Sequence, residues 1–122
     1  MPHVPNAHGV YVDCEHVVLA RALQTGAAIL DLAEADDGTW RLGFTLKTRS
    51  PGSSSGARVN GYRYDTREQS LARGVEIARG FCQRVLAGKH LYAQATVHAE
   101  AREMLKQIDE AYPPVGTQLT MF

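Results

Sequence analysis

The clearest pattern in the chain is the alternation of residues 39–48, which read TWRLGFTLKT. Apolar side chains occupy every second position from Trp40 to Leu46, and polar or small residues lie between them. Because successive side chains of a β-strand point to opposite faces, this order predicts a strand with one face in the core. The opposite face would carry Arg41 and Lys47.

The residues on either side of this stretch predict its partners. Residues 29–35 are mostly apolar, and Asp36-Asp37-Gly38 follows them as a turn in which glycine supplies the positive φ that tight turns need. Residues 29–48 are therefore expected to form a hairpin. Residues 49–57, RSPGSSSGA, predict a flexible loop. Residues 58–64 predict a third strand, although Asn60-Gly61 could instead be the turn of a small hairpin.

Helical spacing of apolar residues occurs in three places. Asp13 could cap a helix over 14–25, which Gly26 would end. A second helix is expected over 66–88 behind a capping box of Thr66 and Gln69, and a third over 91–112, closed by prolines. The expected fold is α+β: a small three-stranded antiparallel sheet covered on one face by helices, in the order α-β-β-β-α-α.

Length and composition indicate one soluble domain. The chain has 122 residues, of which 44% are hydrophobic and 21% charged, as in ordinary globular proteins. We expect a domain over 1–112 with an irregular arm at 1–12, followed by a tail at 113–122. No apolar run is long enough for a membrane span and the N-terminus lacks signal-peptide features, so a cytoplasmic location is expected. Cys14 and Cys82 are expected to be free thiols.

The last ten residues differ from the rest of the chain. Residues 113–117, PPVGT, cannot continue a helix and predict a spacer, and the chain then closes with QLTMF. Leu119, Met121 and Phe122 are large apolar groups at a chain end, where their burial is lost unless a surface receives them. The amide of Gln118 could fix the register of such a bound peptide.

The closing pentapeptide resembles the sliding-clamp-binding motif of bacterial replication and repair proteins, usually written Gln-Leu-[Ser/Asp]-Leu-Phe. Gln118, Leu119 and Phe122 match the motif, Thr120 is a small polar substitute, and Met121 keeps the volume of leucine. The resemblance implies that these five residues bind the bacterial DNA sliding clamp. The alternative is that the tail folds back and fills a gap in the domain's own core.

Charge is unevenly distributed although the chain is neutral overall. Residues 13–37 hold six acids and one base, whereas residues 38–67 hold six bases and one acid. A basic strand face could follow a phosphate backbone, and the candidate nucleic-acid-binding residues are Arg41, Lys47, Arg49, Arg58 and Arg63. Residues 28–88 are similar in order to the AP2-like and integrase arm-binding sheet readers of DNA. The alternative is a solvated face whose charges serve solubility and oppose edge pairing. Tyr62 and Tyr64 could stack on bases, but we expect them to be half-buried residues of the sheet.

Metal and catalytic motifs are weak. His3, His8, Cys14 and His16 lie close together in sequence and could in principle gather around zinc, but they fit no recognised ligand spacing. We therefore predict no metal site and no cofactor. The sequence has no phosphate-binding glycine loop, nucleophile elbow or zinc-protease motif, and Asp31 and Glu34 are expected to be solvated charges. The chain is expected to have no enzymatic activity.

These observations favour a small bacterial adaptor that docks on the sliding clamp and touches DNA weakly through its basic strand face. Such a protein would act in recruitment or competition at the clamp, in replication or repair or on a mobile genetic element. One alternative is a nucleic-acid-binding module whose tail is core filler. Another is an antirestriction-like inhibitor or a small enzyme without a readable site.

Overall fold

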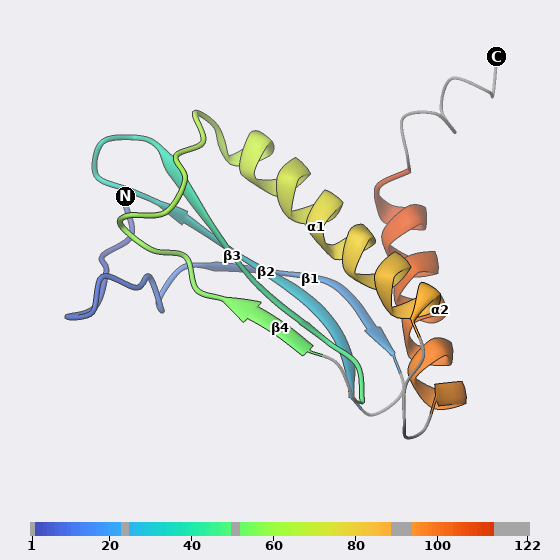
Figure 1. The fold of residues 1–122 in the computed structure, drawn as a ribbon. Helices are drawn as coiled ribbons and strands as arrows, with labels where there is room; N and C mark the ends of the chain where they lie inside the picture. Colours follow the sequence, from blue (N-terminus) through green and yellow to red (C-terminus); the bar gives the residue numbers. More distant parts are fainter. Residues whose placement is uncertain (1, 23–24, 50–51, 89–93, 114–122) are drawn as a thin grey trace, which may run out of the picture.

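The computed structural model describes residues 2–22, 25–49, 52–88 and 94–113. Four strands come first: β1 (Glu15–Ala22), β2 (Gly26–Glu34), β3 (Trp40–Lys47) and β4 (Gly52–Ser55). Two helices follow, α1 (Arg67–Ala87) and α2 (Gln94–Ala111). The strands form one antiparallel sheet in the order β1-β2-β3-β4, and both helices lie on the same side of it (Figure 1). The fold is α+β.

The predicted element order α-β-β-β-α-α is wrong, because residues 14–25 do not form a helix. Residues 15–22 are strand β1, which pairs with β2 from Glu15↔Leu32 to Ala22↔Gly26. The register shifts between Val18 and Ala20, as at a β-bulge, so that the consecutive residues Leu19 and Ala20 are both buried. Such a shift interrupts the period of two that identifies a strand and leaves a spacing that resembles a helix.

The third predicted strand is also misplaced. Residues 58–64 make only two isolated bridges, Val10↔Arg58 and Trp40↔Tyr64, with a turn centred on Val59-Asn60 between them. On the side of β3 that faces away from β2, the pairing strand is β4, which lies within the predicted loop 49–57. Glycine and serine have low strand propensity, but the ladder is made by backbone groups that every non-proline residue carries.

The hairpin of β2 and β3 and the last two helices confirm the sequence predictions. Gly38 has a φ of 84° in the turn between β2 and β3. Thr66 caps α1 by accepting a hydrogen bond from the Gln69 backbone N–H at 3.1 Å. The helices begin and end within three residues of the expected positions.

The main core lies between the helices and one face of the sheet. The strands contribute Leu30, Leu32 and Leu46, and the helices contribute Met104 and Ile108, all essentially without solvent exposure. Gly74 of α1 allows the helix to approach the sheet closely, because a Cβ at this position would collide with Leu30. We call the side of the sheet that packs against the two helices the covered face. The opposite side, on which neither helix lies, is the uncovered face.

The described residues 2–12 form an arm with no helix or strand, and this arm is fastened to the sheet. The backbone N–H of His3 donates to the Glu34 carbonyl at 2.8 Å, and the Glu34 N–H donates to His3 Nδ1 at 2.9 Å. Tyr11 donates its N–H to the Ala57 carbonyl at 2.8 Å. A second, small cluster of Tyr11, Ala33, Ala35 and Ala57 lies here, with Cys14 packed against it.

Candidate functional site

The clamp-binding residues Gln118, Leu119, Thr120, Met121 and Phe122 lie outside the described residues. The position from which the tail begins is described. Helix α2 ends at Ala111, and Pro113 is exposed. Arg79 of α1 holds this end of α2, since its Nε donates to Asp109 at 2.9 Å and its Nη2 to the Tyr112 carbonyl at 2.6 Å. The spacer therefore begins at a surface point that is fixed to the body of the domain.

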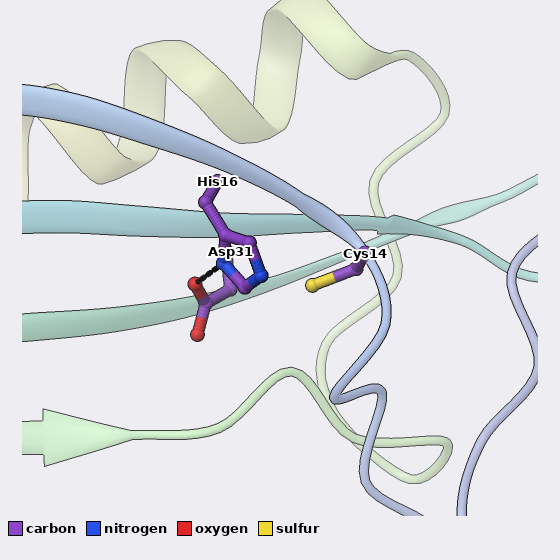
Figure 2. Close-up of side chains that lie close together, drawn as sticks. All are labelled: Cys14, His16 and Asp31. Atoms are coloured by element: carbon purple, nitrogen blue, oxygen red, sulfur yellow. Dashed lines mark hydrogen bonds and ion pairs between the residues drawn. The ribbon is translucent and has the colours of Figure 1, made fainter.

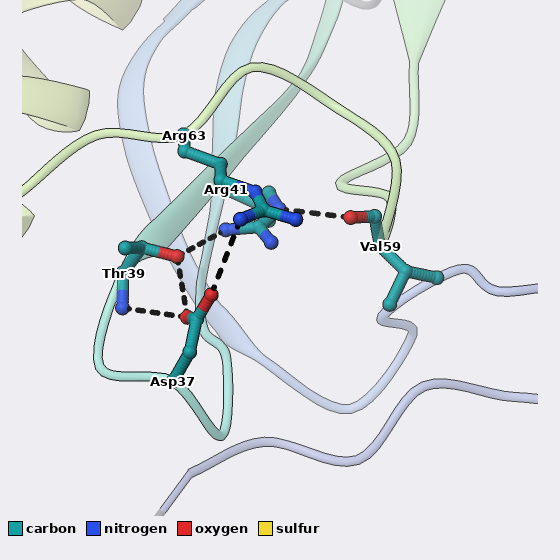
Figure 3. Close-up of polar contacts among 5 residues, drawn as sticks. All are labelled: Asp37, Thr39, Arg41, Val59 and Arg63. Atoms are coloured by element: carbon teal, nitrogen blue, oxygen red, sulfur yellow. Dashed lines mark hydrogen bonds and ion pairs between the residues drawn. The ribbon is translucent and has the colours of Figure 1, made fainter.

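Arg41, the first candidate for nucleic-acid binding, is buried. Only 3% of the residue is exposed. Its Nε donates to the Val59 carbonyl at 3.2 Å, and its Nη1 donates to the Thr39 hydroxyl at 2.6 Å (Figure 3). The guanidinium thus joins β3 to the segment after β4 and does not point at solvent. The alternation in 39–48 placed Arg41 opposite the core correctly, but it could not show that residues 57–61 cover it.

The other four candidate cations are exposed and fall into two groups. Arg58 and Arg63 lie near Arg41, where residues 58 and 64 bridge to the arm and to β3. Lys47 and Arg49 lie at the opposite end of β3. About six residues of strand separate the groups, which is roughly 20 Å. The five residues do not form one continuous row of cations on the sheet.

A groove beside α1 brings aromatic and charged side chains together. Tyr62, Arg63, Tyr64 and Arg73 line it, and the carboxylates of Asp65 and Glu76 lie there too. Tyr62 is 77% exposed, and its ring centroid is 4.8 Å from that of Tyr64. The expectation of half-buried tyrosines is therefore wrong for Tyr62. An exposed ring of this kind can receive a planar group by stacking.

Three potential metal ligands meet on the uncovered face. Cys14 precedes β1, His16 lies on β1, and Asp31 lies on β2 as the direct cross-strand partner of His16. Their ligand atoms all lie within 4.8 Å of one another (Figure 2). His16 Nδ1 is 2.6 Å from Asp31 Oδ1, and the Cys14 thiol donates to the Tyr11 carbonyl at 3.3 Å.

The cysteine of this group is shielded on one side. Burial, followed by the negative charge of Asp31, raises the pKa of the Cys14 thiol to about 11. Glu15, between Cys14 and His16, points to the other face of the sheet, where Arg67 of α1 donates to both its oxygens. These hydrogen bonds hold the pKa of Glu15 below its ordinary value.

Glu100 of α2 is a buried carboxylate that the sequence did not single out. It has no solvent exposure. Its Oε2 accepts from the Thr25 hydroxyl, and its Oε1 accepts from the Arg49 backbone N–H at 2.8 Å. Glu100 therefore connects α2 to the turn before β2 and to the end of β3. Its position among Val97, Ala101 and Met104, in the apolar stripe of the helix, is the sequence signal of its burial.

Comparisons with protein families, with curated proteins and with solved structures gave no match to this chain. Within the described ranges, neither helix is long and apolar enough to cross a membrane.

Proposed function

We propose that this protein is a non-enzymatic adaptor that docks on the bacterial DNA sliding clamp through residues 118–122. The pentapeptide QLTMF carries the proposal. It combines a register-fixing amide at Gln118 with apolar anchors at Leu119 and Phe122, and the spacer before it begins with two prolines.

The geometry at the end of α2 supports this proposal. Arg79 binds both Asp109 and the Tyr112 carbonyl, so the root of the spacer has a defined position. Pro113 is exposed there, and proline cannot extend α2. A peptide that starts from such a point can reach a partner without requiring any change in the sheet or the helices.

The test compares the intact chain with a Leu119→Ala, Phe122→Ala double variant in a clamp-binding titration. Each anchor should contribute about 1.5–3 kcal/mol, so the double variant should bind about a hundredfold more weakly or worse. Val115→Ala, in the spacer, is the matched control and should bind like the intact chain. Equal affinity of the intact and doubly substituted chains would refute clamp docking.

Deletion of residues 118–122 separates docking from core filling. A docking tail can be removed with little change in melting temperature, whereas core filler cannot. A large loss of melting temperature on deletion would favour the alternative in which the tail packs into the domain.

The exposure of Tyr62 favours a second candidate function, the binding of single-stranded nucleic acid in the groove beside α1. Tyr62 could stack on a base while Arg63 and Arg73 contact phosphates. Weak contact of this kind would suit an adaptor, because docking on the clamp raises its effective concentration on DNA.

The nucleic-acid test uses substitutions that leave Arg41 in place. Arg63→Gln together with Arg73→Gln should reduce the salt dependence of binding to single-stranded DNA by about one unit per lost contact, and Tyr62→Ala should lower affinity at every salt concentration. Lys47→Gln, remote from the groove, is the control. Absence of binding at low salt would exclude this function.

A further inference from the structure

The sheet register brings Cys14, His16 and Asp31 together. Cys14 and His16 are two residues apart and therefore share a face, while Glu15 between them points to Arg67 on the covered face. Asp31 pairs directly with His16 across β1 and β2. The three side chains consequently converge on the uncovered face, where Figure 2 shows them directed toward one another.

We propose that Cys14 Sγ, His16 Nδ1 and the Asp31 carboxylate form a binding site for a zinc-type divalent metal ion. Thiolate, imidazole and carboxylate are the three ligand types that zinc uses in proteins, whereas magnesium and calcium prefer oxygen ligands alone. Cysteine and aspartate together supply two negative charges, which neutralise a divalent cation at this partly buried position.

The known distances between the ligand atoms bracket those of a tetrahedral site. Zinc bonds of about 2.0–2.3 Å require ligand atoms roughly 3.3–3.8 Å apart. His16 Nδ1 and Asp31 Oδ1 are 2.6 Å apart, and the widest separation in the group is within 4.8 Å. Small side-chain rotations, without movement of the paired strands, would bring all three ligand atoms into range.

Metal binding requires two proton changes. His16 Nδ1 must present its lone pair, so it gives up to water the proton that it now donates to Asp31, and the ring carries its one remaining proton on Nε2. The Cys14 thiol releases to water the proton that it now donates to the Tyr11 carbonyl. Asp31 then accepts the metal in place of the imidazole proton.

The site is shielded at Cys14 and open to solvent at His16. Cys14 packs against Tyr11 and small alanines of the second cluster, which shields the thiol. The His16 side chain is 54% exposed. Three protein ligands with one open side match a zinc ion that keeps its fourth position for water or for a donor atom of another molecule. Asp13 adds negative charge close to Cys14, which favours a cation.

The test is a titration of the reduced full-length chain with zinc, followed by calorimetry and by elemental analysis after gel filtration. One zinc per chain is expected. Cys14→Ser, His16→Asn and Asp31→Asn should each weaken binding by about a hundredfold or more, beyond the roughly 10–100-fold effect of losing an outer-shell partner. His8→Asn, an exposed histidine of the arm, is the matched control and should leave the affinity unchanged.

Cobalt(II) identifies the thiolate ligand directly. The cobalt-loaded chain should show thiolate-to-cobalt charge-transfer absorption that Cys14→Ser abolishes and Cys82→Ala retains. If the cysteine variant fails to fold, His16→Asn tests zinc binding in its place, because His16 is exposed and its replacement should leave the sheet intact. The proposal is overturned if His16→Asn and Asp31→Asn bind zinc like the intact chain, or if no zinc remains bound after gel filtration.

Discussion

The two faces of the sheet are built from alternate residues of the same strands, yet they serve different purposes. On the covered face, Leu30, Leu32 and Leu46 lie under two helices and exclude water. On the uncovered face, the cross-strand pair of His16 and Asp31 remains accessible beside Cys14. The domain thus places its large apolar side chains between the sheet and the helices, whereas the other face combines a small buried cluster with polar, ligand-forming side chains.

Leu30→Ala should produce the largest effect, because Leu30 is fully buried on the covered face. We expect a loss of about 2–5 kcal/mol in the free energy of unfolding, measured by chemical denaturation. Ile29→Ala is the matched control in the next position of β2, whose side chain lies on the uncovered face and is only partly buried. Similar losses for the two substitutions would contradict the division of roles between the faces.

Gly74→Ala tests the close contact between α1 and the covered face of the sheet. Its added Cβ would collide with the Leu30 side chain and should cost about 1–3 kcal/mol. The cost should shrink in a Leu30→Ala background, so a double-mutant cycle should show coupling between the two positions.

Gly80→Ala is the control for helix propensity in α1. A Cβ there would lie 3.4 Å from Arg84 Nη1, at the far end of a flexible side chain. This substitution should stabilise the protein by up to about 1 kcal/mol. If Gly74→Ala and Gly80→Ala destabilised the protein equally, the close approach of α1 to β2 would not explain the loss at Gly74.

Glu100→Gln tests the polar contact at the end of the covered face. A glutamine can keep its oxygen for the Arg49 N–H only by turning its NH2 toward the Thr25 hydroxyl, which then accepts instead of donating, and the charge of the carboxylate is lost from both hydrogen bonds. We expect a cost of about 1–3 kcal/mol in the free energy of unfolding. Glu103→Gln, one turn further along α2 on the exposed side, should change stability by less than about 0.5 kcal/mol.

Glu15→Gln should have the smallest effect, since the ion pair with Arg67 is about one-third exposed on each side. The loss at neutral pH should be about 1 kcal/mol or less. The pKa of Glu15 is lowered in the folded state, so the pair stabilises the fold above the ordinary value of 4.5 and loses this contribution as pH falls through the lowered pKa. The two proteins should therefore converge in acid, as followed by denaturation in the presence of a chelator. If the intact chain and Glu15→Gln still differed in stability in acid, the ion pair with Arg67 would not be the cause of the difference.

The elements with local signals could be predicted from the sequence. The alternation in 39–48 and the turn at Gly38 determine the central hairpin, and the capping residues Thr66 and Gln69 determine the start of α1. Strand β1 was missed because the register shift after Val18 places two consecutive residues in the core. Strand β4 was missed because its pairing with β3 is made by the backbone, which leaves no pattern in the side chains.

The candidate sites depend on long-range pairing to a greater degree. The spacing of Cys14 and His16 becomes informative only when residues 15–22 are known to be a strand. Asp31 joins them only through the register of β1 and β2. The burial of Arg41 likewise depends on a segment 18 residues later, whose Val59 carbonyl accepts from its guanidinium. A single sequence contains no record of these pairings.

Glu100 has a consequence for the order of folding. Its two partners are 75 and 51 residues away in the chain, whereas each strand of the sheet pairs with its neighbour in sequence. During synthesis the whole sheet leaves the ribosome before α2 does, and the Thr25 hydroxyl and the Arg49 N–H must bond to water until Glu100 arrives. Because contacts between residues this far apart require a large loop-closure entropy, we expect them to be weak in the folding transition state, so that the loss of Glu100 accelerates unfolding and hardly slows folding. We therefore expect the carboxylate to lengthen the lifetime of the native state, as measured by the unfolding rate of Glu100→Gln.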